Sequence, residues 1–330
     1  MRQGVKKKAQ LDRWRIKKAL DRAIAVPFEF TDLRSSYTTQ YERKVYLHEE
    51  LEKLGISTVK WDGLDAIPIQ TKSGLLVALL TGRPSSPSWE EKMRALANAV
   101  DSTRAKMSFN KDQVDHQRGK CPTIGTGVSY GSGATGSGSK HNTRAVLELR
   151  KTPELAQLSG FVNKAFQNYA PILSTFCKLI LTRFETKNPT LRRPFPDSAF
   201  GTMSFNFGPD VCTFPHKDFK NLSWGWCVVT SFGDYDHTKG GRLTKPGIKR
   251  VSLGPGLVDG IHQVVNIAAS NPHFPVILHW TGRHTGDHFH VKAFIDPSFP
   301  SILPSTNTMT FWLAHGVRRR WIGLSTYEEP

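Results

Sequence analysis

Short apolar segments separated by turn residues predict a small β-meander in the first quarter of the chain. The segments are residues 59–61, 67–69 and 75–80, and Asp-Gly and Ser-Gly pairs lie between them. Such pairs favour the tight turns that join neighbouring antiparallel strands. We expect a helix before these strands, over residues 41–54, with Gly55 as its end.

Two longer segments are predicted to be helical. The first covers residues 89–107, where Ser88 followed by Glu91 has the spacing of a capping box. The second covers residues 153–186, which carry apolar residues at helical spacing, and Pro171 is expected to break or kink it. Its apolar positions, which we assign to the core, include Leu158, Phe161, Val162, Ala165, Phe166 and Tyr169.

Residues 125–139 are rich in Gly and Ser, a composition typical of an exposed loop. Within them, residues 131–136 match the G-x-G-x-x-G pattern of dinucleotide-binding turns. The pattern leads into more Gly and Ser and not into a helix whose N-terminus would bind a pyrophosphate. We therefore expect an exposed loop here and no nucleotide site.

Residues 204–243 read as strand, hairpin and strand, and they contain a His-x-Asp pair. Side chains at positions i and i+2 of a strand point to the same face, so His216 and Asp218 would lie side by side, with Lys217 turned away. An imidazole and a carboxylate are two of the three ligands of a 2-His-1-carboxylate Fe(II) site. The pair therefore indicates a metal site, with His216 and Asp218 as its catalytic residues.

Further motifs accompany this pair in a fixed order. Those around it are SFNFGP at 204–209, Asn221-Leu222, Gly225-Trp226-Cys227, GDYD at 233–236 and GGRL at 240–243. Those before it are WDG at 61–63, LTGRP at 80–84, GVSYG at 127–131 and LRRPFP at 191–196. In this order the motifs resemble fungal proteins related to the TET/JBP-type 2-oxoglutarate/Fe(II)-dependent dioxygenases, over about residues 45–243.

The resemblance implies an α+β fold with a double-stranded β-helix (jelly-roll) core flanked by helices. It implies Fe(II) as the metal, 2-oxoglutarate as the cosubstrate, and oxidation of a C–H bond with release of succinate and CO2. The substrate that it suggests is a modified pyrimidine in nucleic acid, such as 5-methylcytosine. The alternative is a catalytically inactive relative that acts as a nucleic-acid or protein-binding module.

The third metal ligand stays open at this point. Relatives place a second His and then an Arg downstream, and His273 with Arg283 fits that spacing best, the Arg binding the distal carboxylate of 2-oxoglutarate. His262 is the alternative, in a more strand-like setting. From Thr244 onward the chain departs from the family pattern, which leaves open whether the core is complete at the C-terminus. A separate site formed by His284, His288 and His290 is a further alternative.

The net charge of +17 is concentrated in part near the N-terminus, a segment that we expect to be helical but poorly anchored. Lys and Arg neutralise phosphates with release of counterions, so this segment favours polyanions such as DNA or other nucleic acid. A solvated basic helix or a localisation signal is the alternative. The candidate contact residues are Lys6, Lys7, Lys8, Arg13, Arg15, Lys17 and Lys18.

The chain of 330 residues, 38% of them hydrophobic, is large enough to bury a substantial core. We divide it into a basic arm at 1–40, an α/β part at 41–200, a metal-binding β-helix core at 201–295 and a tail at 296–330. The 4 cysteines lack CxxC spacing, and neither a signal peptide nor a long apolar run is evident. We expect an intracellular protein that does not act in a membrane, with nuclear location left open.

Overall fold

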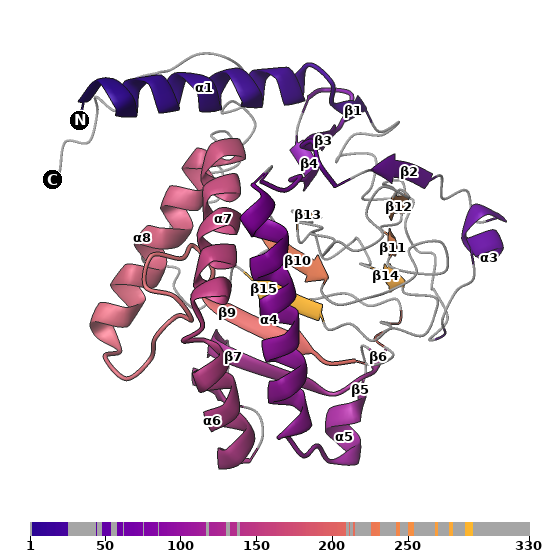
Figure 1. Ribbon diagram of the computed structural model, residues 1–330, viewed down its shortest axis with the longest axis vertical. Helices are drawn as coiled ribbons and strands as arrows, with labels where there is room; N and C mark the ends of the chain where they lie inside the picture. The colour runs from indigo at the N-terminus through magenta and orange to yellow at the C-terminus, as the bar shows by residue number, and fades with distance from the viewer. Residues whose placement is uncertain are drawn as a thin grey trace, which may run out of the picture.

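The protein combines helices and strands, which confirms the α+β class (Figure 1). The computed structural model describes residues 2–25, 44, 48–53, 58–61, 63–74, 76–84, 86–116, 119–129, 133–136, 139–208, 211, 214, 226–231, 242–244, 250–253, 268–269, 277–279 and 288–292. Among these, no helix has the length and apolar character needed to cross a membrane.

A six-stranded antiparallel sheet forms the centre of the described structure. Its strands, in spatial order, are β13 (Ala268–Ala269), β10 (Trp226–Ser231), β15 (His288–Lys292), β9 (Thr202–Asn206), β7 (Thr123–Ser129) and β8 (Gly133–Gly136). The part of the chain after Thr244, where the family motifs fade, thus supplies the strand that lies between β9 and β10.

A four-stranded sheet contains β14 (Ile277–His279), β11 (Arg242–Thr244), β12 (Arg250–Leu253) and β2 (Thr58–Trp61). The predicted meander is wrong in its first strand, because β2 pairs with β12 in parallel. After β2, the Trp61 indole donates a hydrogen bond to the Asp65 carbonyl, and Gly63 adopts a positive φ of 76°. This turn directs the chain away from β2 instead of folding it back alongside.

The remaining strands form small sheets. The predicted antiparallel pairing of the second and third meander strands is confirmed for β3 (Ile67–Gln70) and β4 (Leu76–Leu80), and β1 (Ile24–Ala25) joins β3 in parallel. A short pair consists of β5 (Asp115–His116) and β6 (Gly119–Lys120), which follows α5 (Lys111–Val114).

The long helices are α1 (Arg2–Leu20), α4 (Pro87–Ala105), α6 (Lys140–Leu149), α7 (Pro153–Tyr169) and α8 (Pro171–Lys187), and the short α3 spans His48–Lys53. Each long helix after α1 begins at a Pro or directly after a capping Ser. The predicted break at Pro171 is confirmed. The predicted cap of α4 is wrong: Ser86 is the N-cap, because Pro87 fits the first helical position, and the Ser88 hydroxyl lies 2.8 Å from that of Ser86.

Helices α4, α6, α7 and α8 cover one face of the six-stranded sheet and bury a common core with it (Figure 1). The Phe166 ring stacks on Phe200 at 5.3 Å and on Trp226 at 5.2 Å between ring centroids, so α7, the segment before β9 and β10 meet in one aromatic cluster. Burial raises the pKa of the Cys177 thiol to about 12, which suits a side chain that packs here as an apolar group.

The segment that composition predicts to be an exposed loop, residues 125–139, instead contains most of β7 and all of β8. Small side chains here allow close packing. Gly127 has a φ of +109°, and a Cβ atom at this position would collide with the Gly201 carbonyl oxygen and lie 2.9 Å from Cδ of Pro194. Glycine is therefore required for contact between β7 and the segment that enters β9, and not for flexibility.

We expect Gly127→Ala to lower the free energy of unfolding by about 2 kcal/mol or more, because the substitution adds both a steric clash and left-handed backbone strain. Gly160→Ala in α7 is the matched control: its Cβ would meet nothing within 4 Å, and alanine should raise helix stability by about 0.5–1 kcal/mol. Urea unfolding of both variants measures the difference. Equal stability of the two variants would contradict this account of Gly127.

Candidate functional site

The predicted metal and cosubstrate ligands lie outside the described residues and stay predictions. They are His216, Asp218, His273, His262 and Arg283, together with His284 of the alternative site. The backbone places His288 and His290 on β15. Among the residues that the structure describes, no group of three or more His, Cys, Asp or Glu is arranged to hold a metal ion.

The structure does describe the strands from which the His-x-Asp segment departs and to which it returns. Asn206 at the end of β9 pairs in register with His288 of β15, and His288 pairs with Ser231 at the end of β10. Both β9 and β10 are antiparallel to β15 and hence parallel to each other. The last residue of β9 and the first residue of β10 therefore lie at opposite ends of the strands, and residues 207–225, which include the His-x-Asp pair, join these two ends.

Strand β9 separates apolar from polar side chains. Met203 and Phe205 belong to the core beneath the helices, and since a strand alternates its faces, Thr202, Ser204 and Asn206 point to the other side. Thr202 and Asn206 are nevertheless buried, at 8% and 7% exposure. The sheet face opposite the helices is thus lined along β9 by short polar groups. In the sequence, this face is indicated by the alternation of polar and apolar residues in TMSFNF, residues 202–207.

A chain of hydrogen bonds fixes the Asn206 amide at the end of that face. The Thr123 hydroxyl donates to Asn206 Oδ1 at 3.0 Å, and His116 Nε2 lies 2.8 Å from the same hydroxyl and 3.0 Å from the Cys121 carbonyl oxygen. A carbonyl oxygen only accepts, so the second contact requires a proton on Nε2. The amide NH2 of Asn206 is thereby turned away from Thr123. Sequence analysis missed His116 and Thr123, which no motif contains.

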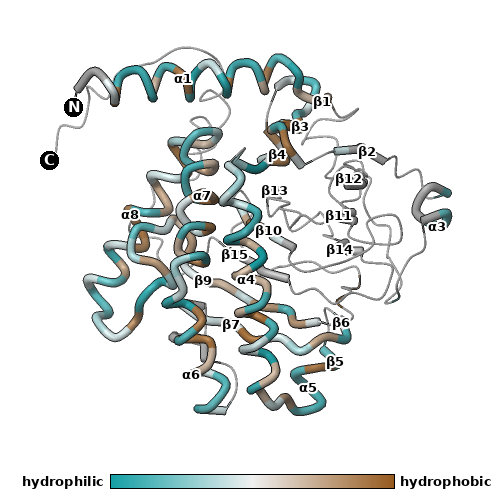
Figure 2. Tube along the Cα trace, in the orientation of Figure 1, coloured by the Kyte–Doolittle hydropathy of each residue, from teal (hydrophilic) through white to brown (hydrophobic). Residues whose placement is uncertain are grey.

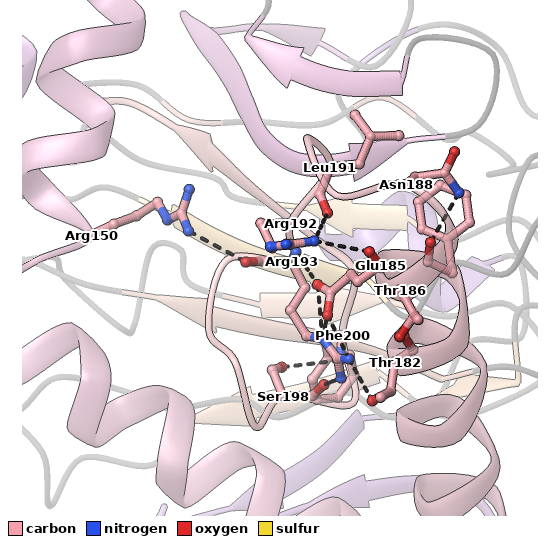
Figure 3. A network of polar contacts seen from close by, with 11 residues as sticks. Arg150, Thr182, Glu185, Thr186, Asn188, Leu191, Arg192, Arg193, Ser198 and Phe200 are labelled. Atoms are coloured by element: carbon pink, nitrogen blue, oxygen red, sulfur yellow. Dashed lines mark hydrogen bonds and ion pairs between the residues drawn. The ribbon is translucent and has the colours of Figure 1, made fainter.

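Arg193 holds the segment that enters β9 (Figure 3). Its side chain, 3% exposed, forms an ion pair with Glu185 of α8 at 2.8 Å, and its other donors reach Thr182 Oγ1 and the Ser198 carbonyl oxygen, each at 2.8 Å. Burial alone would raise the pKa of Glu185, but the hydrogen bonds and charge of Arg193 outweigh it and lower that pKa below its ordinary value. The second Arg of the LRRPFP motif is therefore a structural residue.

Arg150, which follows α6, provides a second attachment for the same segment (Figure 3). Its guanidinium donates to the Pro194 carbonyl oxygen and, at 3.2 Å, to Thr126 Oγ1 on β7. Desolvation lowers the pKa of this arginine. The two arginines together fix the position at which β9 begins, and hence the position from which the His-x-Asp segment leaves.

The candidate nucleic-acid contacts are brought together on one helix. Every one of them lies on α1 and is exposed: Lys6, Lys7, Lys8, Arg13, Arg15, Lys17 and Lys18. The predicted helix is confirmed over Arg2–Leu20. A contact with nucleic acid stays a prediction.

No protein-family model matches the chain. Curated proteins match it over short segments: "Fatty acid synthase 2" of Mycosarcoma maydis is 47% identical over 55 residues, and "Fatty acid synthase subunit beta" of Saccharomyces cerevisiae is 50% identical over 56 residues. Each match covers 17% of this chain and only 2% and 3% of the respective relative. None of the motifs predicts this similarity.

Two solved structures resemble the protein at low sequence identity. "NgTET1 in complex with 5mC DNA" has a TM-score of 0.48 and 14% identity, covering 81% of this chain and 86% of that one. The dioxygenase for auxin oxidation from rice has a TM-score of 0.31 and 10% identity, covering 79% of this chain and 96% of the rice protein.

We expect Glu185→Gln to lower the free energy of unfolding by about 3 kcal/mol at neutral pH, because it leaves the buried Arg193 without its counter-charge. The folded-state pKa of Glu185 is depressed, so its contribution is present above the ordinary glutamate range and is lost as the pH falls through the folded pKa. The difference in the free energy of unfolding between wild type and Glu185→Gln should therefore become smaller as the pH is lowered.

Glu148→Gln provides the control for this substitution. Glu148 also pairs with a cation, Lys151 at 2.8 Å, but both side chains are well exposed, at 60% and 70%. We expect no measurable change in stability, since solvent screens such a pair. The role assigned to the Glu185 charge would be contradicted if the difference in free energy of unfolding between wild type and Glu185→Gln were the same at neutral and acidic pH.

Proposed function

We propose that this protein is a 2-oxoglutarate/Fe(II)-dependent dioxygenase-like enzyme that oxidises a modified pyrimidine in nucleic acid. The observation that carries the proposal is the polar side of β9, on which Thr202 and Asn206 are buried opposite the helices. In the sequence, the His-x-Asp motif follows the end of this strand. A buried sheet face lined by polar groups is suited to bind a small acid and a substrate together.

The path of the chain between the sheets supports the proposed double-stranded β-helix. From β10 in the six-stranded sheet the chain passes to β11 and β12 in the four-stranded sheet, then to β13, β14 and β15, which alternate between the two. Repeated passage between two sheets is typical of jelly-roll folds, and every pair among β10 to β15 that the structure describes is antiparallel. Helices on one outer face agree with the flanking helices that the motif resemblance implies (Figure 1).

The donor chemistry fits Fe(II). His216 and Asp218 offer an imidazole and a carboxylate, and His273, or alternatively His262, would complete a 2-His-1-carboxylate set. When bound, the iron with 2-oxoglutarate and dioxygen would supply the oxidation of a C–H bond. The protein would supply the rest: Arg283 would bind the distal carboxylate of 2-oxoglutarate, and the buried polar face would orient the substrate. A base in a duplex must leave the stack to reach such a pocket.

The test is an anaerobic titration of the full chain with Fe(II) and 2-oxoglutarate, followed by the visible charge-transfer band of the chelated oxo acid. We expect a band in the wild type and its loss in His216→Ala, because this substitution removes one metal ligand. In a separate assay with dioxygen present, Asp218→Ala should lose 2-oxoglutarate turnover, because it removes another ligand. His141→Ala is the control. This exposed histidine on α6 bonds only to the Lys106 carbonyl oxygen among its described contacts, and its removal should leave the band intact.

A folded wild-type protein without a band, or an Asp218→Ala variant with unchanged turnover, would overturn the proposal. The same titration distinguishes the candidates for the third ligand. We expect His273→Ala to abolish the band and His262→Ala to retain it, and Arg283→Ala to weaken 2-oxoglutarate binding more than Fe(II) binding.

The exposed basic surface of α1 favours a second candidate, a nucleic-acid-binding module that needs no catalysis. Replacement of Lys6, Lys7 and Lys8 together by Gln keeps good helix formers and removes charge. If these residues bind phosphates, nucleic-acid affinity should fall. The negative slope of log K against log salt should also become shallower, by about 0.7–0.9 for each phosphate that is no longer neutralised. An unchanged slope would show that these three lysines of α1 do not bind phosphates and would contradict this candidate function.

A further inference from the structure

Helix α1 is attached to the protein near its C-terminal end. Ala19 is buried at 3% exposure, and just beyond the helix Arg22 Nη1 lies 3.1 Å from Asp65 Oδ2. From this attachment the helix runs across the ends of α7 and of the β3–β4 hairpin toward the N-terminus (Figure 1). Most of its residues are therefore exposed to solvent, and Figure 2 shows that hydrophilic residues predominate along the helix.

One side of α1 faces the protein, and the other carries a stripe that mixes cations with an aromatic ring. Positions 9, 12, 16 and 19 are partly or fully buried and share a face by their spacing. The opposite side carries a continuous stripe, because four residues follow one another there at intervals of three or four positions: Lys7, Leu11, Trp14 and Lys18. We call these four residues the Trp14 stripe.

The Trp14 side chain is the unusual member of this stripe. It is 56% exposed, and Lys18 Nζ lies 5.2 Å from the centroid of its ring. Most of the indole stays in water, although a tryptophan gains more from burial than almost any other side chain. Cations precede and follow it along the stripe. A partner that covers this surface must therefore offer both negative charge and a flat apolar face.

The chemistry of the stripe distinguishes between classes of polyanion. An anionic membrane would require the apolar side chains of α1 to share one face, but Val5, which is 67% exposed, lies on the side of the helix opposite Trp14. A paired duplex offers phosphates, but its base faces are covered by stacking. A single strand offers phosphates together with uncovered bases that stack on aromatic side chains.

We propose that the Trp14 stripe of α1 binds single-stranded nucleic acid, with Lys7 and Lys18 on phosphates and Trp14 stacked on an unpaired base. The basic residues on either side of the stripe, Arg13 and Lys17 among them, add sequence-independent attraction. This binding needs neither iron nor 2-oxoglutarate, so it can be tested independently of the proposed oxygenase activity.

The experiment measures binding of labelled oligothymidylate, and of a duplex of equal length, to the full metal-free chain by fluorescence anisotropy. We expect Trp14→Ala to bind oligothymidylate roughly tenfold more weakly, because one base stack is removed, with duplex affinity unchanged. Trp14→Phe should restore most of the affinity, since a phenyl ring still stacks. Val5→Ala, at an exposed apolar position on the side of α1 opposite Trp14, is the control and should bind as the wild type does.

Circular dichroism of each variant checks that α1 remains helical. Wild-type affinity for oligothymidylate in Trp14→Ala would overturn the proposal. Equal losses for single strand and duplex would also overturn it, because they would indicate a change in general charge attraction and not in stacking. Tighter binding of the wild type to anionic vesicles than to oligothymidylate would identify a membrane surface as the partner instead.

Discussion

The described structure depends on the alternation of side chains along β9. Met203 and Phe205 are buried beneath the helices, while Thr202 and Asn206 are buried on the opposite face. A shift of the register by one residue would place polar groups in the aromatic core and phenyl and thioether groups on the polar face. Because β9 pairs with both β7 and β15, its register also determines theirs. One pattern of residues thus positions both the core and the candidate site.

The arginine network explains why this register is held so firmly. A buried guanidinium is costly unless its donors are satisfied, and Arg193 satisfies its donors only when Glu185, Thr182 and Ser198 are in place. These partners come from α8 and from the segment immediately before β9. A displaced β9 would separate them. The network therefore contributes specificity for one arrangement in addition to any net stability.

Much of the helical part could be predicted from the sequence, because its signals are local. The break at Pro171 and the buried positions of α7, such as Leu158 and Phe166, follow from backbone chemistry and helical spacing alone. The errors arose where partners are distant in sequence. Pairing of β2 with β12 has no local signal, and Gly127 indicated a loop although its lack of a side chain serves close packing against Gly201. The polar partners of Asn206 also come from separate segments of the chain.

The part of the chain after Thr244 lacks the family motifs, and yet it contributes to the geometry of the candidate site. Strand β15 pairs with β9 on one side and with β10 on the other, and among the described strands it alone connects these two. Since residues 207–225 join the end of β9 to the start of β10, β15 sets the distance that this segment must cover. A motif resemblance that ends at residue 243 therefore still depends on the following residues to hold the two ends of the segment that carries the His-x-Asp motif.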